Sequence, residues 1–158
     1  MADCGHEHHH AHLSGEALAA ELAGAAGRCE TAGQKLTPPR RRVLELLLRA
    51  GQPVKAYDLI AAFGEDGAPA KPPTVYRALE FLTQQGFAHR IESLNAYVAC
   101  KRGDEGHAAA FLICDCCGAT REIASHGASP ILALGDAAGY ALNSVTIEAH
   151  GLCGDCRG

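Results

Sequence analysis

The first half of the chain alternates apolar stripes of helical spacing with residues that begin and end helices. One helix is predicted between Ser14, a good N-cap residue, and Gly27. A second is predicted between the N-cap residue Thr37 and Gly51, with a proline at its first position. The apolar stripes of these two helices are Leu18, Leu22 and Ala25, and Val43, Leu44, Leu47 and Leu48.

Two further helices are predicted before residue 87. The third covers roughly Ala56–Phe63, and a Gly- and Pro-containing loop follows it over 64–73. The fourth begins at Thr74, ends at Gly86 and has its own apolar stripe. Three short helices of this kind indicate a helix-turn-helix, whose last helix places its first turn in the major groove of DNA. The stripe of the fourth helix is Val75, Ala78, Leu79 and Leu82.

Tyr76 and Arg77 lie in that first turn and off the apolar stripe. Arginine can bind guanine O6 and N7, and tyrosine can pack on a thymine methyl group. The alternative is that both are surface residues of an ordinary helical bundle. Thr74, Lys71 and Arg40 complete the set of residues that we expect to contact DNA, and Arg40 begins a run of three arginines suited to a phosphate backbone.

Apolar and polar residues then alternate over 87–92 and 96–100, which predicts an antiparallel hairpin, the wing of a winged helix. A hairpin symmetric about the bond between Leu94 and Asn95 places His89 directly opposite Cys100, with Cβ atoms about 5 Å apart. An imidazole and a thiolate at that distance can share a metal ion. Taken alone, a strand histidine is more often a surface residue and a cysteine a small core residue.

The last third of the chain predicts strand, strand, helix and strand. The strands cover 108–114, 121–123 and about 140–150, and the helix runs from a cap at Ser129 to Ala138. So few residues bury little core, so we expect a zinc ion and pairing with a second copy to stabilise them, in a symmetric homodimer. The predicted fold is α+β: a winged-helix domain over 14–101 and a small α/β dimerisation domain over 102–158, after a disordered His-rich tail over 1–13.

Two C-x-x-C motifs carry the strongest chemical signal. They supply four thiolates, which is the tetrahedral ligand set of a structural zinc site. Cys116 is a third thiol in the first motif, but C-x-x-C spacing favours Cys117 over it. Disulfides or a thioredoxin-like redox site fit less well, because the chain shows no sign of secretion and has two such motifs. The expected zinc ligands are Cys114, Cys117, Cys153 and Cys156.

A second metal site is expected from His89, Cys100, His107 and Glu122, which together supply nitrogen, sulfur and oxygen ligands. Four protein ligands leave no open position for a reactive water, so we do not expect an enzyme. A zinc-storage or chaperone function would depend instead on the N-terminal tail, which holds Cys4 and five histidines and is alternatively an unstructured leader.

Composition and charge narrow the class of protein. The 158 residues are 47% hydrophobic and 20% charged, and no signal peptide is evident, so we expect a soluble cytoplasmic protein. The net charge is −4, yet residues 34–102 hold eleven Lys or Arg against six Asp or Glu. The remaining residues therefore hold three against twelve. A basic segment joined to an acidic one fits a DNA-binding domain followed by a domain that stays off DNA.

Five stretches of the sequence resemble the ferric uptake regulator family: LTPPR, KPPTVYRALEFL, QGFAHRIESLNAYVAC, H-x6-C-x-x-C-G and IEAHGLC-x-x-C. The resemblance covers nearly all of 14–157 and is most specific to the zinc uptake regulator branch. The His-His-Asp-His cluster that iron-sensing members often carry is missing, and only His107 stands in that place.

This resemblance implies a zinc-responsive repressor of zinc uptake genes, which binds palindromic operators with zinc as co-repressor. It also implies two zinc ions per subunit, one in the four-cysteine site and one regulatory ion on the second set of ligands. Tyr76 and Arg77 would contact bases. Iron, manganese or peroxide sensing, as in other members of the family, is the alternative.

Overall fold

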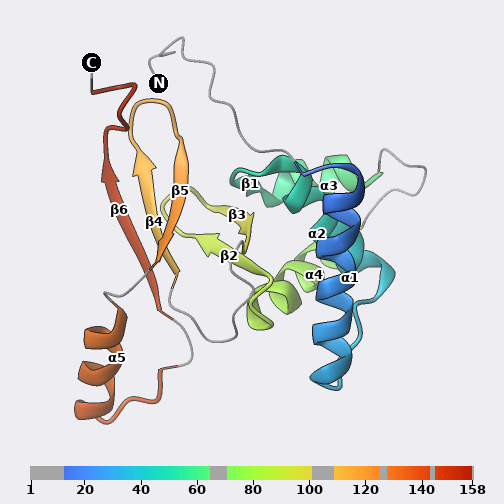
Figure 1. The fold of residues 1–158 in the computed structure, drawn as a ribbon, viewed down its shortest axis with the longest axis horizontal. Coiled ribbons are helices and arrows are strands. Elements are labelled where there is room, and N and C mark those ends of the chain that lie inside the picture. The colour runs from blue at the N-terminus through green and yellow to red at the C-terminus, as the bar shows by residue number, and fades with distance from the viewer. Residues whose placement is uncertain (1–12, 65–70, 101–108, 125–127, 143–144, 158) are drawn as a thin grey trace. The chain divides into compact units, whose positions relative to one another are not determined.

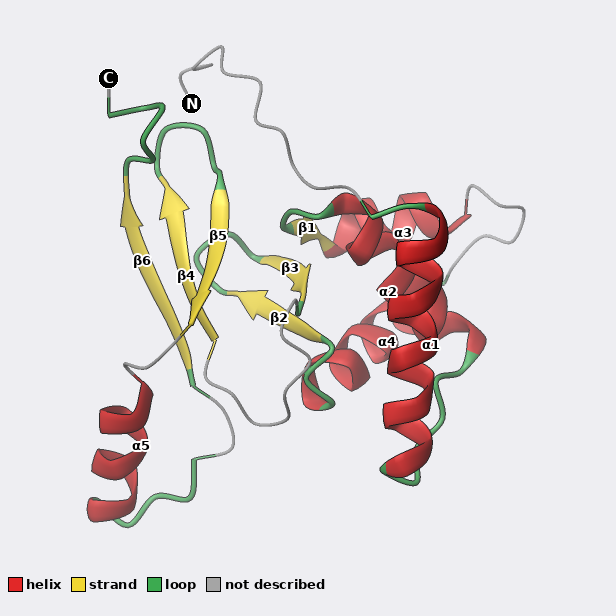
Figure 2. Cartoon of the chain, viewed as in Figure 1, coloured by secondary structure: helices red, strands yellow, loops and turns green. Residues whose placement is uncertain are grey.

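The computed structural model describes residues 13–64, 71–100, 109–124, 128–142 and 145–157, which form two compact units (Figure 1). Helices dominate the first unit and a three-stranded sheet the second, which confirms the predicted mixed fold (Figure 2). The first unit holds α1 (Gly15–Thr31), α2 (Pro38–Ala50), β1 (Val54–Lys55), α3 (Ala56–Phe63), α4 (Pro72–Gln84), β2 (Ala88–Ile91) and β3 (Ala96–Ala99). The second holds β4 (Ala109–Cys114), β5 (Thr120–Ala124), α5 (Ala128–Ala137) and β6 (Thr146–Gly151).

Helix α1 begins after Ser14 as predicted but continues four residues beyond Gly27, so the predicted end was wrong. A glycine inside a helix costs about 1 kcal/mol relative to alanine. The extra turn offsets this cost because it buries Cys29 against the core, and the Thr31 hydroxyl donates a 3.0 Å hydrogen bond to the Gly27 carbonyl. The glycine is therefore tolerated, and the helix ends at Thr31.

The structure confirms the predicted bounds of α2 and α3 and the predicted end of α4. Helix α2 ends at Gly51, which adopts a left-handed conformation with φ 62°. Helix α4 begins at Pro72, two residues earlier than predicted, because proline fits the first turn of a helix, where its missing N–H leaves no bond unmade. The stripes of these helices meet in one core that includes Leu47, Leu79 and Leu82.

The wing hairpin forms, but in a different register from the one predicted. His89 pairs with Val98, and Cys100 lies two positions further along the same face. The difference arises at the turn, where Asn95 adopts a left-handed conformation (φ 46°) and donates its N–H to the Glu92 carbonyl. Four residues therefore connect the paired strands, which moves the centre of the turn by one residue toward Ser93.

Strand β1 joins the edge of this hairpin and was not predicted. Val54 pairs with Tyr97 and Lys55 with Ala96, so the sheet has the order β1-β3-β2. Two residues are too few to show a period of two in the sequence. The strand nevertheless ties the start of α3 to the wing.

In the second unit, β4 lies between β5, to which it is antiparallel, and β6, to which it is parallel. The last strand begins at Thr146, not at Tyr140. The N–H of Tyr140 bonds the Gly135 carbonyl and that of Gly139 bonds the Asp136 carbonyl, so these residues close α5 in a Schellman motif and do not pair in the sheet. Helix α5 begins one residue before the expected cap at Ser129.

Some predictions fall on residues outside the described ranges. They concern the N-terminal tail over 1–12, residues 65–70 of the predicted loop, residues 101–106 between the wing and the next strand, and His107. Within the described ranges, no helix has both the length and the apolar character needed to cross a membrane.

Candidate functional site

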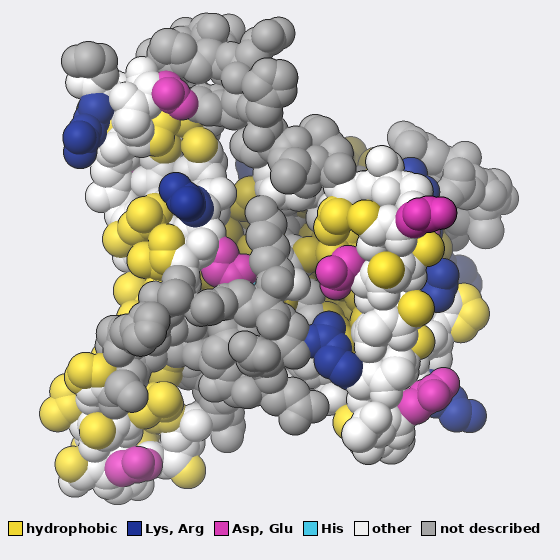
Figure 3. Space-filling model, viewed as in Figure 1, with side chains coloured by type: hydrophobic (Ala, Val, Ile, Leu, Met, Phe, Trp, Pro, Cys, Tyr) yellow, Lys and Arg dark blue, Asp and Glu magenta, His cyan; other side chains and the backbone are white. Residues whose placement is uncertain are grey.

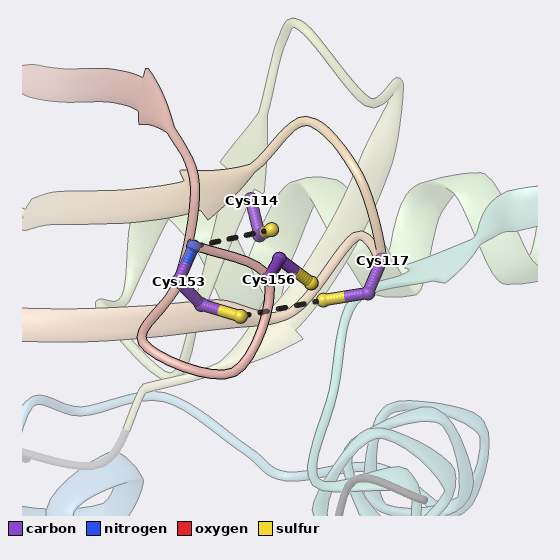
Figure 4. A group of neighbouring side chains, drawn as sticks. All are labelled: Cys114, Cys117, Cys153 and Cys156. Carbon is purple, nitrogen blue, oxygen red and sulfur yellow. Dashed lines mark hydrogen bonds between the residues drawn. The ribbon is translucent and has the colours of Figure 1, made fainter. Parts of the chain in front are cut away.

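The sheet of the second unit brings the two C-x-x-C motifs together. Cys114 is the last residue of β4, and the register of the parallel pair places it beside Gly151, the last residue of β6. Parallel strands end at the same edge of a sheet, so the loops that follow them leave side by side. Cys117 lies in the loop after β4, and Cys153 and Cys156 lie in the loop after β6 (Figure 4).

The four sulfur atoms have the spacing of a metal site. All of them lie within 4.8 Å of one another, and Sγ of Cys117 is 3.8 Å from Sγ of Cys153. Zinc binds thiolates at about 2.3 Å, so two ligands of a tetrahedral site lie about 3.8 Å apart. The donor set and its spacing therefore fit a zinc ion. Cys116 is not part of this cluster, as the C-x-x-C spacing indicates.

Backbone groups around the cluster favour a thiolate at Cys114. The backbone N–H groups of Cys117 and Cys153 point at its sulfur and lower the pKa of Cys114 to about 6, and the latter donates over 3.3 Å. Gly118, at φ 74°, closes the turn that aims the first of these groups. Burial, together with the neighbouring thiol of Cys153, raises the pKa of Cys156. A divalent cation reverses such a rise by deprotonating the thiols that bind it.

A side-chain pair beside this cluster was missed by the sequence analysis. Nδ1 of His150, on β6, lies 3.0 Å from Oδ1 of Asp115, inside the first C-x-x-C motif. The N–H of Asp115 also donates to the Gly151 carbonyl over 2.8 Å. The sequence signal was the position of a histidine three residues before the second motif, but its partner lies 35 residues away and depends on the sheet register.

Two of the four predicted regulatory ligands meet on the wing. His89 and Cys100 each offer a ligand atom, and these atoms lie within 4.8 Å of each other. They are diagonal neighbours on one face and not direct partners, which corrects the expected geometry but preserves the shared face. Glu122 lies on β5 of the other unit, opposite Phe111. His107 is outside the described residues.

Tyr76 and Arg77 lie in the second turn of α4 and not in the first as predicted, because the helix begins two residues earlier. Tyr76 is 52% exposed, and Arg77 and Lys71 are exposed, whereas Thr74 is half-buried. Arg40, on α2, is more constrained. Its guanidinium lies 3.5 Å from the centroid of the Phe81 ring, and Nη1 donates to the Lys35 carbonyl over 2.7 Å.

Comparison with known proteins identifies relatives over most of the chain. The model of the ferric uptake regulator family matches residues 31–150. A zinc uptake regulation protein of Escherichia coli (strain K12) is 45% identical over 137 residues, which cover 85% of this chain and 80% of that relative. The family match includes the wing, β4 and the first C-x-x-C motif.

Solved structures give the same result. A zinc uptake regulator complexed with zinc and DNA matches with a TM-score of 0.81 and 43% identity, over 90% of this chain and 97% of that chain. The crystal structure of holo XcZur matches with a TM-score of 0.78 and 41% identity, over 87% and 97% respectively. The likeness therefore extends over both units and is shared by sequence and fold.

Proposed function

This chain belongs to the ferric uptake regulator family, and we propose that it is a zinc-dependent transcriptional repressor of zinc uptake genes. It binds palindromic operator DNA as a homodimer, and zinc is its co-repressor. The observation that carries the proposal is the pair of distinct ligand clusters, one of four thiols and one begun by His89 and Cys100 on the wing. The first suits a permanent structural ion and the second a regulatory one.

Zinc is the metal that the four-cysteine cluster supports best. Thiolates are soft ligands, and a complete tetrahedral set leaves no position for a substrate. The second unit offers few elements with which to bury a core, so a metal that ties β4 to β6 contributes directly to its folding. We assign Cys114, Cys117, Cys153 and Cys156 to this structural ion.

The regulatory ion accounts for the second zinc per subunit in the proposal. His89 and Cys100 supply nitrogen and sulfur ligands from the wing, and their spacing supports a shared ion. We assign His107 and Glu122 as the remaining ligands, on the resemblance of the sequence to zinc uptake regulators. Ligands drawn from both units make the site dependent on how the units are arranged, which is the requirement for a sensor that changes DNA affinity.

Recognition of DNA is assigned to the first two turns of α4. Tyr76 and Arg77 are exposed there, next to Lys71 and after two prolines that fix the start of the helix. Base-edge contacts from Arg77 give sequence preference, and contacts from Lys71 and Arg40 to phosphates give affinity. Two such helices in a dimer would contact half-sites about 34 Å apart, as in palindromic operators.

Apolar side chains exposed on the second unit support the dimer. Helix α5 leaves Ile131, Leu132 and Leu134 exposed, the last at 68%, and hydrophobic side chains gather over this helix in Figure 3. Leu112 on β4 and Ile123 on β5 are exposed as well. Apolar surface of this kind in one small unit is typical of a protein–protein interface, and a second copy is the partner that symmetry favours.

The decisive experiment measures metal content and metal-dependent DNA binding together. The purified dimer is stripped of its weakly held metal, then titrated with zinc, iron(II) and manganese(II) against a palindromic operator and a scrambled duplex. We expect zinc alone to restore specific binding. Restoration by iron or manganese would favour another sensor of the family, and no specific binding with any metal would favour zinc storage.

A further inference from the structure

Phe87 joins the recognition helix to the strand that carries His89. The N–H of Phe87 donates to the Leu82 carbonyl over 2.8 Å, and the N–H of Gly86 donates to the Thr83 carbonyl. With Gly86 in the left-handed conformation, at φ 71°, these bonds form a Schellman motif that ends α4. The path from the last turn of α4 to His89 is therefore short and hydrogen-bonded.

Cys100 is attached to the same residue. Its N–H donates to the Phe87 carbonyl over 2.9 Å, immediately beyond the last ladder pair of the hairpin. Phe87 thus lies two residues before one proposed regulatory ligand and is hydrogen-bonded to the other. A change in the spacing of His89 and Cys100 therefore has a short, hydrogen-bonded backbone path to α4 through Phe87.

The ring of Phe87 is held from α1. It is 4% exposed, and the guanidinium of Arg28 lies 4.5 Å from its centroid. Arg40 makes a similar contact with α4 itself, because its guanidinium lies 3.5 Å from the centroid of the Phe81 ring.

We propose that Arg28 is a positioning residue that couples the His89–Cys100 pair to the recognition helix by fixing the ring of Phe87. This inference rests on the proposed function, since it assigns a route for regulation at the same site. A loose connection absorbs a local change through its own torsions, whereas a stiff one passes the change to the next element. The guanidinium over the ring makes this connection stiff.

The test measures how much zinc tightens operator binding, as the ratio of dissociation constants with the regulatory site empty and filled. Arg28→Met removes the cation but keeps an unbranched side chain, and we expect it to lower this ratio about three- to tenfold. Arg28→Lys keeps a cation and should retain most of the ratio. The matched control is Arg49→Met. Arg49 lies in the last turn of α2, and its guanidinium donates to the carboxylate of Glu45.

Phe87→Leu provides a second route, since it keeps an apolar core residue and removes the aromatic face. The ratio should fall as it does in Arg28→Met. In the double variant it should fall no further, because both substitutions remove the same contact between Arg28 and Phe87. Operator affinity with the regulatory site empty should stay within about twofold of the unmodified protein in all these variants.

An unchanged ratio in Arg28→Met would overturn the inference, and so would an equal loss of affinity with the site empty and filled, which is what a purely structural role predicts. Additive losses in the double variant would overturn it as well. If zinc failed to tighten operator binding in the unmodified protein, the proposed function would fall first and this inference with it.

Discussion

Nδ1 of His150 lies 3.0 Å from Oδ1 of Asp115, and this contact fastens strand β6 to the first C-x-x-C motif. The side chains are 39% and 59% exposed, so solvent screens their attraction and the pair contributes at most about 1 kcal/mol. The backbone bond from Asp115 to Gly151 and the four sulfur atoms supply most of the attachment. The side-chain pair therefore makes a small contribution to the attachment of β6 to this motif.

We accordingly predict that His150→Ala accelerates zinc release from the four-cysteine site by no more than about fivefold, the factor that corresponds to about 1 kcal/mol. Zinc release into a chromogenic chelator, followed in the purified dimer, measures this rate. His150→Gln can still donate to Asp115, so its rate of zinc release should lie between those of the unmodified protein and His150→Ala. Loss of the structural zinc already during purification would show that the pair is essential.

Arg77→Ala should weaken specific operator binding by about 1 to 3 kcal/mol while leaving the melting temperature and zinc content unchanged. The reason is that Arg77 is exposed on α4 and is not among the buried residues of this helix. Fluorescence anisotropy with operator and scrambled duplexes measures the loss, and Arg49→Ala is the control for removal of one positive charge. Equal weakening on both duplexes would assign Arg77 to phosphate contact.

Removal of residues 1–12 should leave zinc-dependent operator binding intact, because the sequence of this tail has no apolar periodicity that could be buried. The matched control is removal of residues 1–26, which also takes away Leu18 and Leu22 of the core. The longer truncation should lower the melting temperature, whereas the shorter one should not. Loss of repression in the shorter variant would assign the tail a functional role.

Sequence patterns predicted the helices and strands better than the register and the contacts between them. The bounds of α2 and α3 followed from local signals, namely a proline at the first turn, an apolar stripe and a terminal glycine. The cluster of four cysteines was equally predictable from the sequence, because each C-x-x-C motif places two thiols at the spacing of metal ligands. Each of these features is complete within a few consecutive residues.

Features that depend on one backbone conformation were missed. The wing register depended on Asn95 adopting positive φ, and the start of β6 depended on Tyr140 closing α5. The sequence does not specify the backbone conformation of either residue, because asparagine and tyrosine occur in several conformations. The partnership of His150 with Asp115 depended in turn on the β4–β6 register. Long-range geometry of this kind is set by packing and not by local pattern.

The two proposed zinc sites should separate on chelation, because their ligands differ in kind and in structural support. Four thiolates at the ends of paired strands hold zinc more tightly than a mixed site on the wing, and structural zinc contributes its binding free energy to folding. A moderate chelator should therefore remove one zinc per subunit and abolish operator binding while the dimer persists. Harsher treatment should remove the second and unfold the unit that contains β4–β6, as measured by metal analysis, light scattering and circular dichroism.

Single substitutions should divide in the same way. Cys100→Ser and His89→Ala should each give a folded dimer that retains the structural zinc but no longer responds to added zinc. Cys114→Ser or Cys153→Ser should give poorly folded or monomeric protein, since a ligand that ties β4 to β6 is lost. Cys29→Ala, which removes a buried thiol outside both clusters, is the control and should keep both zinc ions. Two outcomes would contradict the regulatory assignment. Unfolding of Cys100→Ser would show that Cys100 is structural, and operator binding that still depends on zinc would show that Cys100 is not needed for the response.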